Sequence, residues 1–295
     1  MKIVQQVMVV CALGLFVFCA SGPAQGQVPA GPPPKWVQPP DMTPMGLDVK
    51  ATEPVILADD FLCTNRGFIT NIQVWGSWLG DYLPSGNAAA VAFRLQIYGD
   101  IPDPDPQYPL DWSMPAETVL WEKMFYSAGY PTTFTVEPYY TLPSEPEGEG
   151  WFDPLSYIYT PDADYTIWRY NFDIPLTEAF EQLGTPGAPV VYWLALEAFV
   201  QDPEAQFGWK SSSQHWNDDA VWRYDSSNPP GGDLTFSNQT VTTVPLWGEL
   251  RYPYDHELAG QSIDLAFVIA PEPITLTVLA LGMLPAVLLK RKRTL

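Results

Sequence analysis

The stretch that decides the fold is residues 91–98 (VAFRLQIY), in which large apolar side chains alternate with Arg94 and Gln96. A two-residue period places the apolar side chains on one face and the polar ones on the other, which is the pattern of a half-buried β-strand. Residues 190–200 are apolar on both faces apart from Glu197. This second pattern predicts a central strand that is covered on both sides.

Other short runs are rich in aromatic and β-branched residues and are separated by turns rich in Pro, Gly, Asp and Asn. They predict further strands at 55–63, 68–78, 118–126, 132–136, 165–172, 207–211, 220–224, 244–250 and 263–269. Only residues 176–183 are expected to be helical, ending at Gly184. The sequence therefore predicts an all-β fold: a two-layer antiparallel β-sandwich of jelly-roll-like form, with a barrel as the alternative.

The sequence before this region has the features of an export signal. Residues 1–26 combine Lys2, an apolar core at 7–19 and small residues at Ala24 and Gly26, where a signal peptidase would cut. Residues 27–54 are rich in proline and are expected to form an extended lead-in. The β-sandwich domain is then expected over residues 55–269.

Residues 270–295 carry three features in a fixed order. Pro271, Glu272 and Pro273 come first, and an uncharged apolar run follows at 274–289. As a helix, this run would span roughly 24 Å, against a bilayer core of roughly 30 Å. A basic cluster at the cytoplasmic side would then stop it, formed by Lys290, Arg291, Lys292 and Arg293. The pattern predicts a single transmembrane helix preceded by an exposed, extended hinge.

This combination resembles the PEP-CTERM sorting signal, which exosortase recognises. The resemblance implies signal peptidase and exosortase as processing partners, transient anchoring in the inner membrane and cleavage near residues 271–273. It also implies a bacterial producer of exopolysaccharide, with the cell surface or extracellular matrix as the final location. A plain membrane anchor is the alternative.

The body of the chain resembles an uncharacterised β-sandwich domain of secreted bacterial proteins that carry this tail. The points of similarity are Asp59-Asp60-Phe61, residues 69–78 (ITNIQVWGSW) and residues 264–269 (DLAFVI). The resemblance covers roughly residues 35–269. It implies a fold and brings no activity or catalytic residues with it.

Charge and cysteine content limit the possible functions. The nine basic and 33 acidic side chains of residues 27–270 leave a net charge of −24 there. Such a surface repels nucleic acid, so we expect no nucleic-acid partner. Outside the predicted signal peptide, Cys63 is the single cysteine, so an internal disulfide cannot form.

Three acidic segments are candidate calcium sites, because hard oxygen ligands in rigid loops suit Ca²⁺. Solvated acidic loops are the alternative at each place, and residues 144–150 are also expected to form such a loop. The candidate ligands are Asp100, Asp103 and Asp105 in the first segment, Asp162 and Asp164 in the second, and Asn217, Asp218 and Asp219 in the third.

Aromatic residues are the other candidate for a binding site. Trp209, Trp216 and Trp222 are expected near strand ends or loops, where exposed rings could stack on sugars. The alternative is that they fill the core.

No catalytic constellation is evident. His215 lies in the polar stretch 211–219 (SSSQHWNDD), but proximity in sequence is no sign of a triad. We therefore expect a non-catalytic, exported surface or matrix protein associated with exopolysaccharide. The alternatives are a carbohydrate-binding module with calcium-stiffened loops and, more weakly, a glycan hydrolase using a carboxylate pair.

Overall fold

The computed structural model describes residues 33–271, except for residue 104 and residues 106–109, 128–133, 143–147 and 226–246. The predicted signal peptide with Ala24 and Gly26, the transmembrane helix, the basic cluster and two residues of the sorting motif lie outside the described residues. Within the described part of the chain, no helix is both long enough and apolar enough to span a bilayer.

The larger sheet contains ten of the described strands, seven of them in the order β1-β18-β5-β14-β2-β9-β10. The other three branch from this path: β11 pairs with β5, β8 pairs with β11, and β17 pairs with β14. Its strands are β1 (Trp36–Gln38), β2 (Leu47–Lys50), β5 (Asn71–Trp78), β8 (Phe134–Thr141), β9 (Glu149–Asp153), β10 (Ile158–Asp164), β11 (Thr166–Asp173), β14 (Phe207–Ser212), β17 (Asp264–Leu265) and β18 (Phe267–Ala270). Among the pairs of described strands, β2 and β9 run parallel and the others are antiparallel.

The second sheet has six strands, in the order β16-β15-β3-β13-β6-β7. These are β3 (Val55–Cys63), β6 (Ala92–Ile101), β7 (Met114–Phe125), β13 (Val190–Phe199), β15 (Val221–Tyr224) and β16 (Gly248–Glu249). Beside the two sheets there are a small ribbon, β4 (Gly67–Ile69) with β12 (Phe180–Gln182), and three single-turn 3₁₀ helices, η1 (Leu79–Asp81), η2 (Pro84–Gly86) and η3 (Leu176–Glu178).

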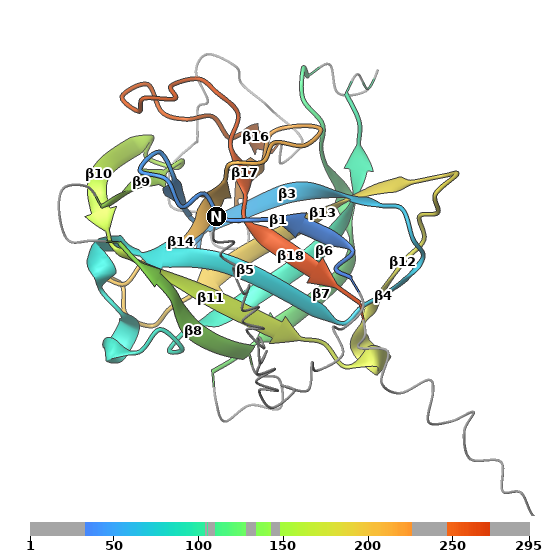
Figure 1. Ribbon diagram of the computed structural model, residues 1–295, viewed down its shortest axis with the longest axis horizontal. Coiled ribbons are helices and arrows are strands. Elements are labelled where there is room, and N and C mark those ends of the chain that lie inside the picture. Colours follow the sequence, from blue (N-terminus) through green and yellow to red (C-terminus); the bar gives the residue numbers. More distant parts are fainter. Residues whose placement is uncertain are drawn as a thin grey trace, which may run out of the picture. The chain divides into compact units, whose positions relative to one another are not determined.

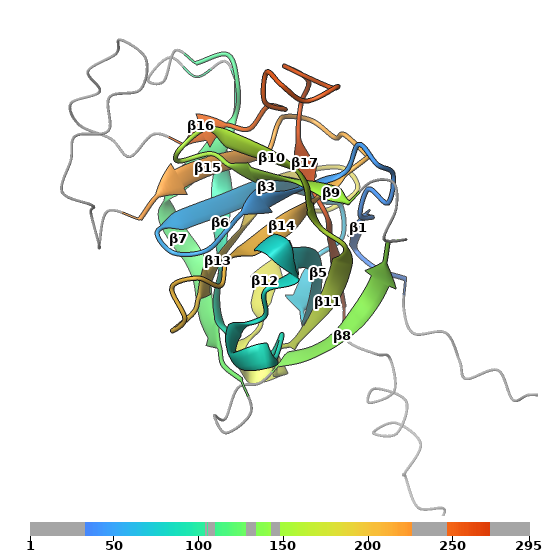
Figure 2. The same cartoon turned by 90° about the vertical axis from the view of Figure 1, so that its left-hand side faces the viewer.

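Figures 1 and 2 show the two main sheets facing each other. Buried apolar side chains from both sheets form one hydrophobic core. Phe93 on β6 illustrates how they meet. Its fully buried ring makes edge-on contacts with aromatic rings of the opposite sheet, at centroid distances of 5.0–5.4 Å, among them Tyr170, Phe172 and Phe207. The prediction of an all-β fold is confirmed, and the arrangement is consistent with a β-sandwich.

The outer face of the six-stranded sheet carries a second, smaller core. On β13, Leu194 and Leu196 point into the main core, whereas Trp193 and Ala195 point into this second cluster. β13 lies between β3 and β6. The predicted central strand covered on both sides is therefore confirmed.

Three expectations need correction. Residues 27–54 were expected to lead into the domain, but from Trp36 onward they contribute β1 and β2 to the larger sheet. Residues 176–183 do not form a helix: a single turn, η3, is followed by strand β12. Pairing of β12 with β4, together with the packing of Phe180 on Tyr192, overrides the local helical preference.

The third correction concerns residues 144–150. Residues 149 and 150 do not belong to a solvated loop but begin β9, and Glu149 is fully buried. The strands β9 and β10 were not predicted, because their sequences (EGWFD and IYTPDAD) carry charges and a proline and show no clean alternation.

We expect Phe93→Ala to lower the free energy of unfolding by about 3–5 kcal/mol, because it removes a buried ring that bridges both sheets. Phe68→Ala, at a ring that is 38% exposed, is the matched control and should cost about 1 kcal/mol or less. Urea unfolding followed by tryptophan fluorescence measures both. Equal losses for the two variants would contradict this assignment of the core.

Candidate functional site

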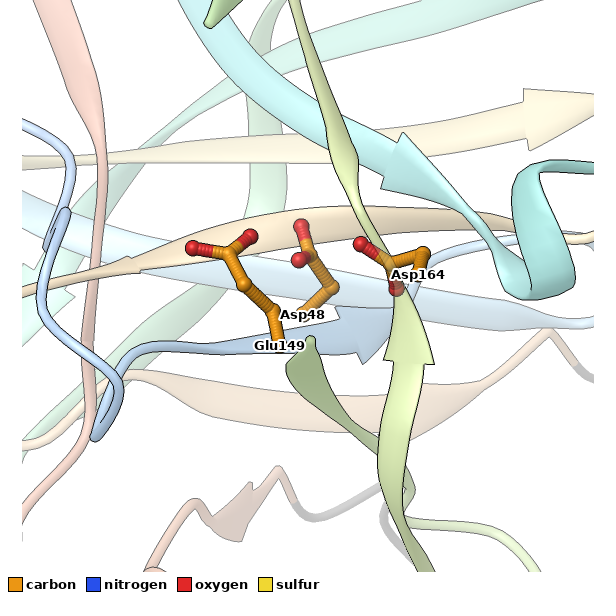
Figure 3. A group of neighbouring side chains, drawn as sticks. All are labelled: Asp48, Glu149 and Asp164. Atoms are coloured by element: carbon orange, nitrogen blue, oxygen red, sulfur yellow. The ribbon is translucent and has the colours of Figure 1, made fainter. Parts of the chain in front are cut away.

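The register of four neighbouring strands brings ionisable side chains together on the larger sheet. Lys210 on β14 lies directly opposite Asp48 on β2. Glu149, the first residue of β9, lies opposite Asp164, the last residue of β10. Since β2 pairs with both β14 and β9, these two cross-strand pairs are neighbours. Figure 3 shows the three carboxyl groups of this cluster side by side. We call the four residues the acid–lysine cluster.

All four side chains of the acid–lysine cluster have no solvent exposure. The Lys210 Nζ lies 2.8 Å from Glu149 Oε1 and 3.8 Å from Asp48 Oδ2. One oxygen from each of the three carboxyl groups lies within 4.8 Å of the others. Gly46 closes over the amine, because a Cβ at this position would lie 2.7 Å from Nζ.

Burial controls the ionisation of the cluster. Desolvation raises the pKa of Asp48, against the opposing effect of Lys210, and raises the pKa of Glu149 to about 8. The pKa of Asp164 is raised well above its ordinary value, first by desolvation and then by the charge of Asp48. Desolvation lowers the pKa of Lys210, but the charges of Glu149 and Asp48 outweigh it and raise the pKa overall. With every group ionised, the closed site would hold two uncompensated negative charges, which favours retained protons or a bound cation.

Of this cluster the sequence indicated only Asp164, as a candidate calcium ligand beside Asp162, because the other members are distant in the chain and meet it only through strand register. The available signal was a charged residue that directly adjoins a large apolar residue in a short strand: Asp48 between Leu47 and Val49, and Lys210 after Trp209.

A second acidic group forms where two of the predicted calcium ligands lie. Asp218 and Asp219 approach Glu249, again with oxygens within 4.8 Å of one another. Arg251 already engages this group, through hydrogen bonds to Glu249 and an Nη2–Oδ2 distance of 3.2 Å to Asp219. The Ser262 hydroxyl also donates a hydrogen bond to Asp219. This group is therefore partly compensated by the protein itself.

The other predicted calcium ligands do not join it. Asp100 accepts a hydrogen bond of 2.8 Å from the Trp193 indole. Asp103 is exposed and Asp105 is half-buried. Within the described residues, neither belongs to a group of three potential ligands. The expectation of a shared site for Asp100, Asp103 and Asp105 is not supported by this geometry.

A third set of buried acids, on β3 and β17, is held by hydrogen bonds. Asp59 Oδ2 accepts from the Gln38 amide and from the backbone N–H of Leu265. Asp60 Oδ2 accepts from Asn217, and Asp264 Oδ2 from the backbone N–H of Trp216. Asp59 and Asp60 therefore serve different partners, as expected of consecutive residues in a strand.

Two of the three tryptophans proposed for sugar stacking lie in the core, which corrects that expectation. Trp209 is fully buried and donates a hydrogen bond to the Ala266 carbonyl, and Trp222 is 8% exposed. Trp216 is half-buried and packs edge-on against Trp36 at 4.9 Å. None of the three forms an open aromatic platform.

A groove of about 460 Å³ is lined partly by Gly148 and Gly150, the neighbours in sequence of Glu149 of the acid–lysine cluster. Its aromatic lining consists of Tyr159 and His256, packed edge-on at 5.2 Å. Its acidic lining, from exposed side chains, consists of Asp162, Asp255 and Glu257.

Two exposed tyrosines lie next to this groove in sequence. Tyr157 and Tyr254 each precede a groove residue by two positions, are 55% and 78% exposed, and stack with an interplanar angle of 14°. Stacked, solvent-facing rings beside carboxylate acceptors suit a ligand with flat apolar faces and hydroxyl donors. These two tyrosines could not be predicted as a pair from the sequence, because they become neighbours only when the loop after β16 meets the β9–β10 hairpin.

We expect the free energy of unfolding to fall as the pH rises from about 5 to about 9. Desolvation raises the folded-state pKa of Asp264 to about 6 and that of Asp60 to about 8, so the folded chain keeps protons that the unfolded chain has released. Their stabilisation is complete below the unfolded pKa of about 4 and is lost as the pH rises through the folded values. Thermal melts across this range, with a chelator present, measure the effect.

Asp60→Asn should flatten the upper part of this pH dependence, because an amide has no proton to lose. Asp103→Asn, at an exposed position, should leave it unchanged. A melting temperature that does not change with pH in the unmodified chain would contradict the prediction.

Comparisons with known proteins agree with the extent of this fold. Residues 34–270 match a family described as a domain of unknown function (DUF7901). No curated protein and no solved structure matches the chain significantly. The matched region begins just before β1 and ends with the last residue of β18, so it coincides with the strands described above. The chain therefore belongs to the DUF7901 family.

Proposed function

We propose that this chain is an exported, non-catalytic protein of the cell surface or extracellular matrix, built on a jelly-roll-like β-sandwich. In this proposal exosortase sorts the chain and cleaves it near Pro271, Glu272 and Pro273, and the released domain associates with exopolysaccharide. The observation that carries the proposal is the junction at residue 270. Strand β18 ends at Ala270, and the Pro-Glu-Pro motif follows without a linker.

This junction favours processing, because a cut within residues 271–273 would leave every strand of the domain intact. The uncharged run 274–289 and the basic cluster after it would stay behind in the membrane. The strong acidity of residues 27–270 favours solubility of the released domain.

The intact mass of the native protein, recovered separately from membranes and from matrix, tests this proposal. We expect a matrix species that begins near Gln27 and ends near residues 270–273. A variant with all three motif residues changed to alanine should instead keep its end at Leu295 and stay in the membrane. Full-length protein confined to the membrane in the unmodified strain would refute the sorting step.

A second candidate function, carbohydrate binding, is favoured by the groove with Tyr157 and Tyr254. Their exposed, parallel rings offer faces for sugar rings, and the neighbouring carboxylates offer acceptors for sugar hydroxyls. Three acidic side chains line the groove and would repel an anionic polymer. The proposed ligand is therefore a neutral glycan, and calcium is no necessary part of this site.

We expect Tyr254→Ala to weaken retention of the protein on neutral exopolysaccharide from the producing cells about tenfold, corresponding to ~1.4 kcal/mol. Tyr140→Ala, at a 44% exposed tyrosine on β8, is the matched control and should bind normally. Both side chains are exposed, so melting temperatures should stay near that of the unmodified protein. Equal binding by both variants in a sedimentation assay would exclude this groove as the glycan site.

A further inference from the structure

Lys210 occupies a place that an ordinary lysine avoids. Its side chain has no solvent exposure, and the groups around its amine are carboxyl groups that are equally buried. Burying an ammonium group carries a large desolvation cost. An ion pair at the surface would avoid that cost. The arrangement places an amine, a carboxyl carbon and a proton acceptor together in a water-excluded site.

The distances assign a separate role to each partner. Glu149 Oε1 lies 2.8 Å from Nζ, at hydrogen-bond distance, where it can accept a proton from the amine. Asp48 Oδ2 lies 3.8 Å from Nζ, beyond a hydrogen bond but within contact distance. Asp48 is also the residue directly opposite Lys210 in the β14–β2 ladder, so strand pairing holds the two side chains on the same face.

We propose that Lys210 and Asp48 condense to form an intramolecular amide bond, with Glu149 as the proton carrier. This inference goes beyond the proposed function and does not depend on sorting or on glycan binding.

The reaction balances without any co-reactant. Glu149 takes a proton from the Lys210 ammonium, and the free Nζ attacks the Asp48 Cγ, whose carboxyl group is in its protonated, neutral form. The Nζ–Cγ bond forms and a Cγ–O bond breaks. The leaving oxygen departs as water, with the second Nζ proton delivered through Glu149. No atom is oxidised or reduced, and one water is lost.

The closed environment favours the attack on Asp48, whereas the first proton transfer is the uphill stage. The neighbouring carboxylates raise the pKa of Lys210 overall, although burial favours the neutral amine and the neutral acid that result from the transfer. Burial also raises the pKa of Asp48, which keeps its carboxyl group in the form that can be attacked. Fixed neighbours react with effective concentrations of about 10⁵–10⁸ M, which offsets the preference of water for hydrolysis.

Peptide mapping of the native protein tests the proposal directly. Trypsin should release residues 36–50 joined to residues 170–223 as one branched species, one water lighter than the sum, because an amide at Lys210 blocks cleavage after it. Fragmentation should place the link between Lys210 and Asp48. The separate peptides 170–210 and 211–223 should be absent.

Two near-isosteric variants of the full chain separate the roles. Glu149→Gln keeps the amine and the attacked carboxyl but removes the proton acceptor, so the linear peptides should reappear. Asp164→Asn is the matched control: it lies in the same cluster but is not within 4.0 Å of the amine, so the branched species should persist. Circular dichroism and melting curves confirm that each variant is folded.

Three results would overturn the proposal. The first is complete cleavage after Lys210 in the folded native protein. The second is a lost water located in a linear peptide, as a succinimide would give. The third is an intact amine with a tightly retained divalent cation in native mass spectrometry, which would make the acid–lysine cluster a metal site. A link from Lys210 to Glu149 would overturn the assignment of Asp48.

Discussion

The contact between Lys210 and Glu149 is the interaction on which the pairing of β14, β2, β9 and β10 in the larger sheet depends. It joins β14 to β9 across β2, and the antiparallel partner of β9 brings Asp164 to the same place. Without the amine, three buried carboxyl groups would face each other with no positive charge among them. Removing one partner of a buried pair typically costs about 3–5 kcal/mol, so until the proposed amide forms the register of these four strands is tied to the Lys210 cation.

Much of the fold could be predicted from the sequence, because many of its strands bury one face and therefore alternate. Residues 91–98 and 190–200 predicted β6 and β13, including the coverage of β13 on both sides. The pattern failed at β9 and β10, where Glu149 and Asp164 are buried although they are charged, and at β12, whose partner is distant in sequence. A two-residue period reports which face is buried only when the polar residues face water.

The candidate sites were harder to predict for a related reason. Asp218 and Asp219 were recognised because they are adjacent in sequence, and they do approach a third acid, Glu249. Asp48 and Lys210 are separated by more than half of the chain, and only the ladder between β2 and β14 relates them. Likewise, Trp209 and Trp222 were expected near strand ends or loops, where they could bind sugars. In the structure both are buried and fill core positions that require large side chains.

The acidity of the chain is distributed differently from what composition suggests. Many carboxyl groups are buried rather than dispersed over the surface, and most have a raised pKa, so they contribute less charge at neutral pH than a formal count assigns. Among the described residues, the buried acids are Asp41, Asp48, Asp59, Asp60, Glu149, Asp164, Glu197, Asp219 and Asp264. The surface is still acidic, but part of the formal negative charge of the sequence belongs to carboxyl groups in the interior.

The strand order also has a consequence for how the chain acquires its fold. β1 pairs with β18, and β18 lies between β1 and β5, so the first and last strands of the domain are neighbours. In the same way, both strands that pair with β2, namely β9 and β14, come later in the sequence. A chain made from its first residue onward therefore cannot complete the larger sheet until residue 270 has emerged. Such long-range pairing is slow, and the early strands keep open edges that a chaperone or a translocation channel must protect.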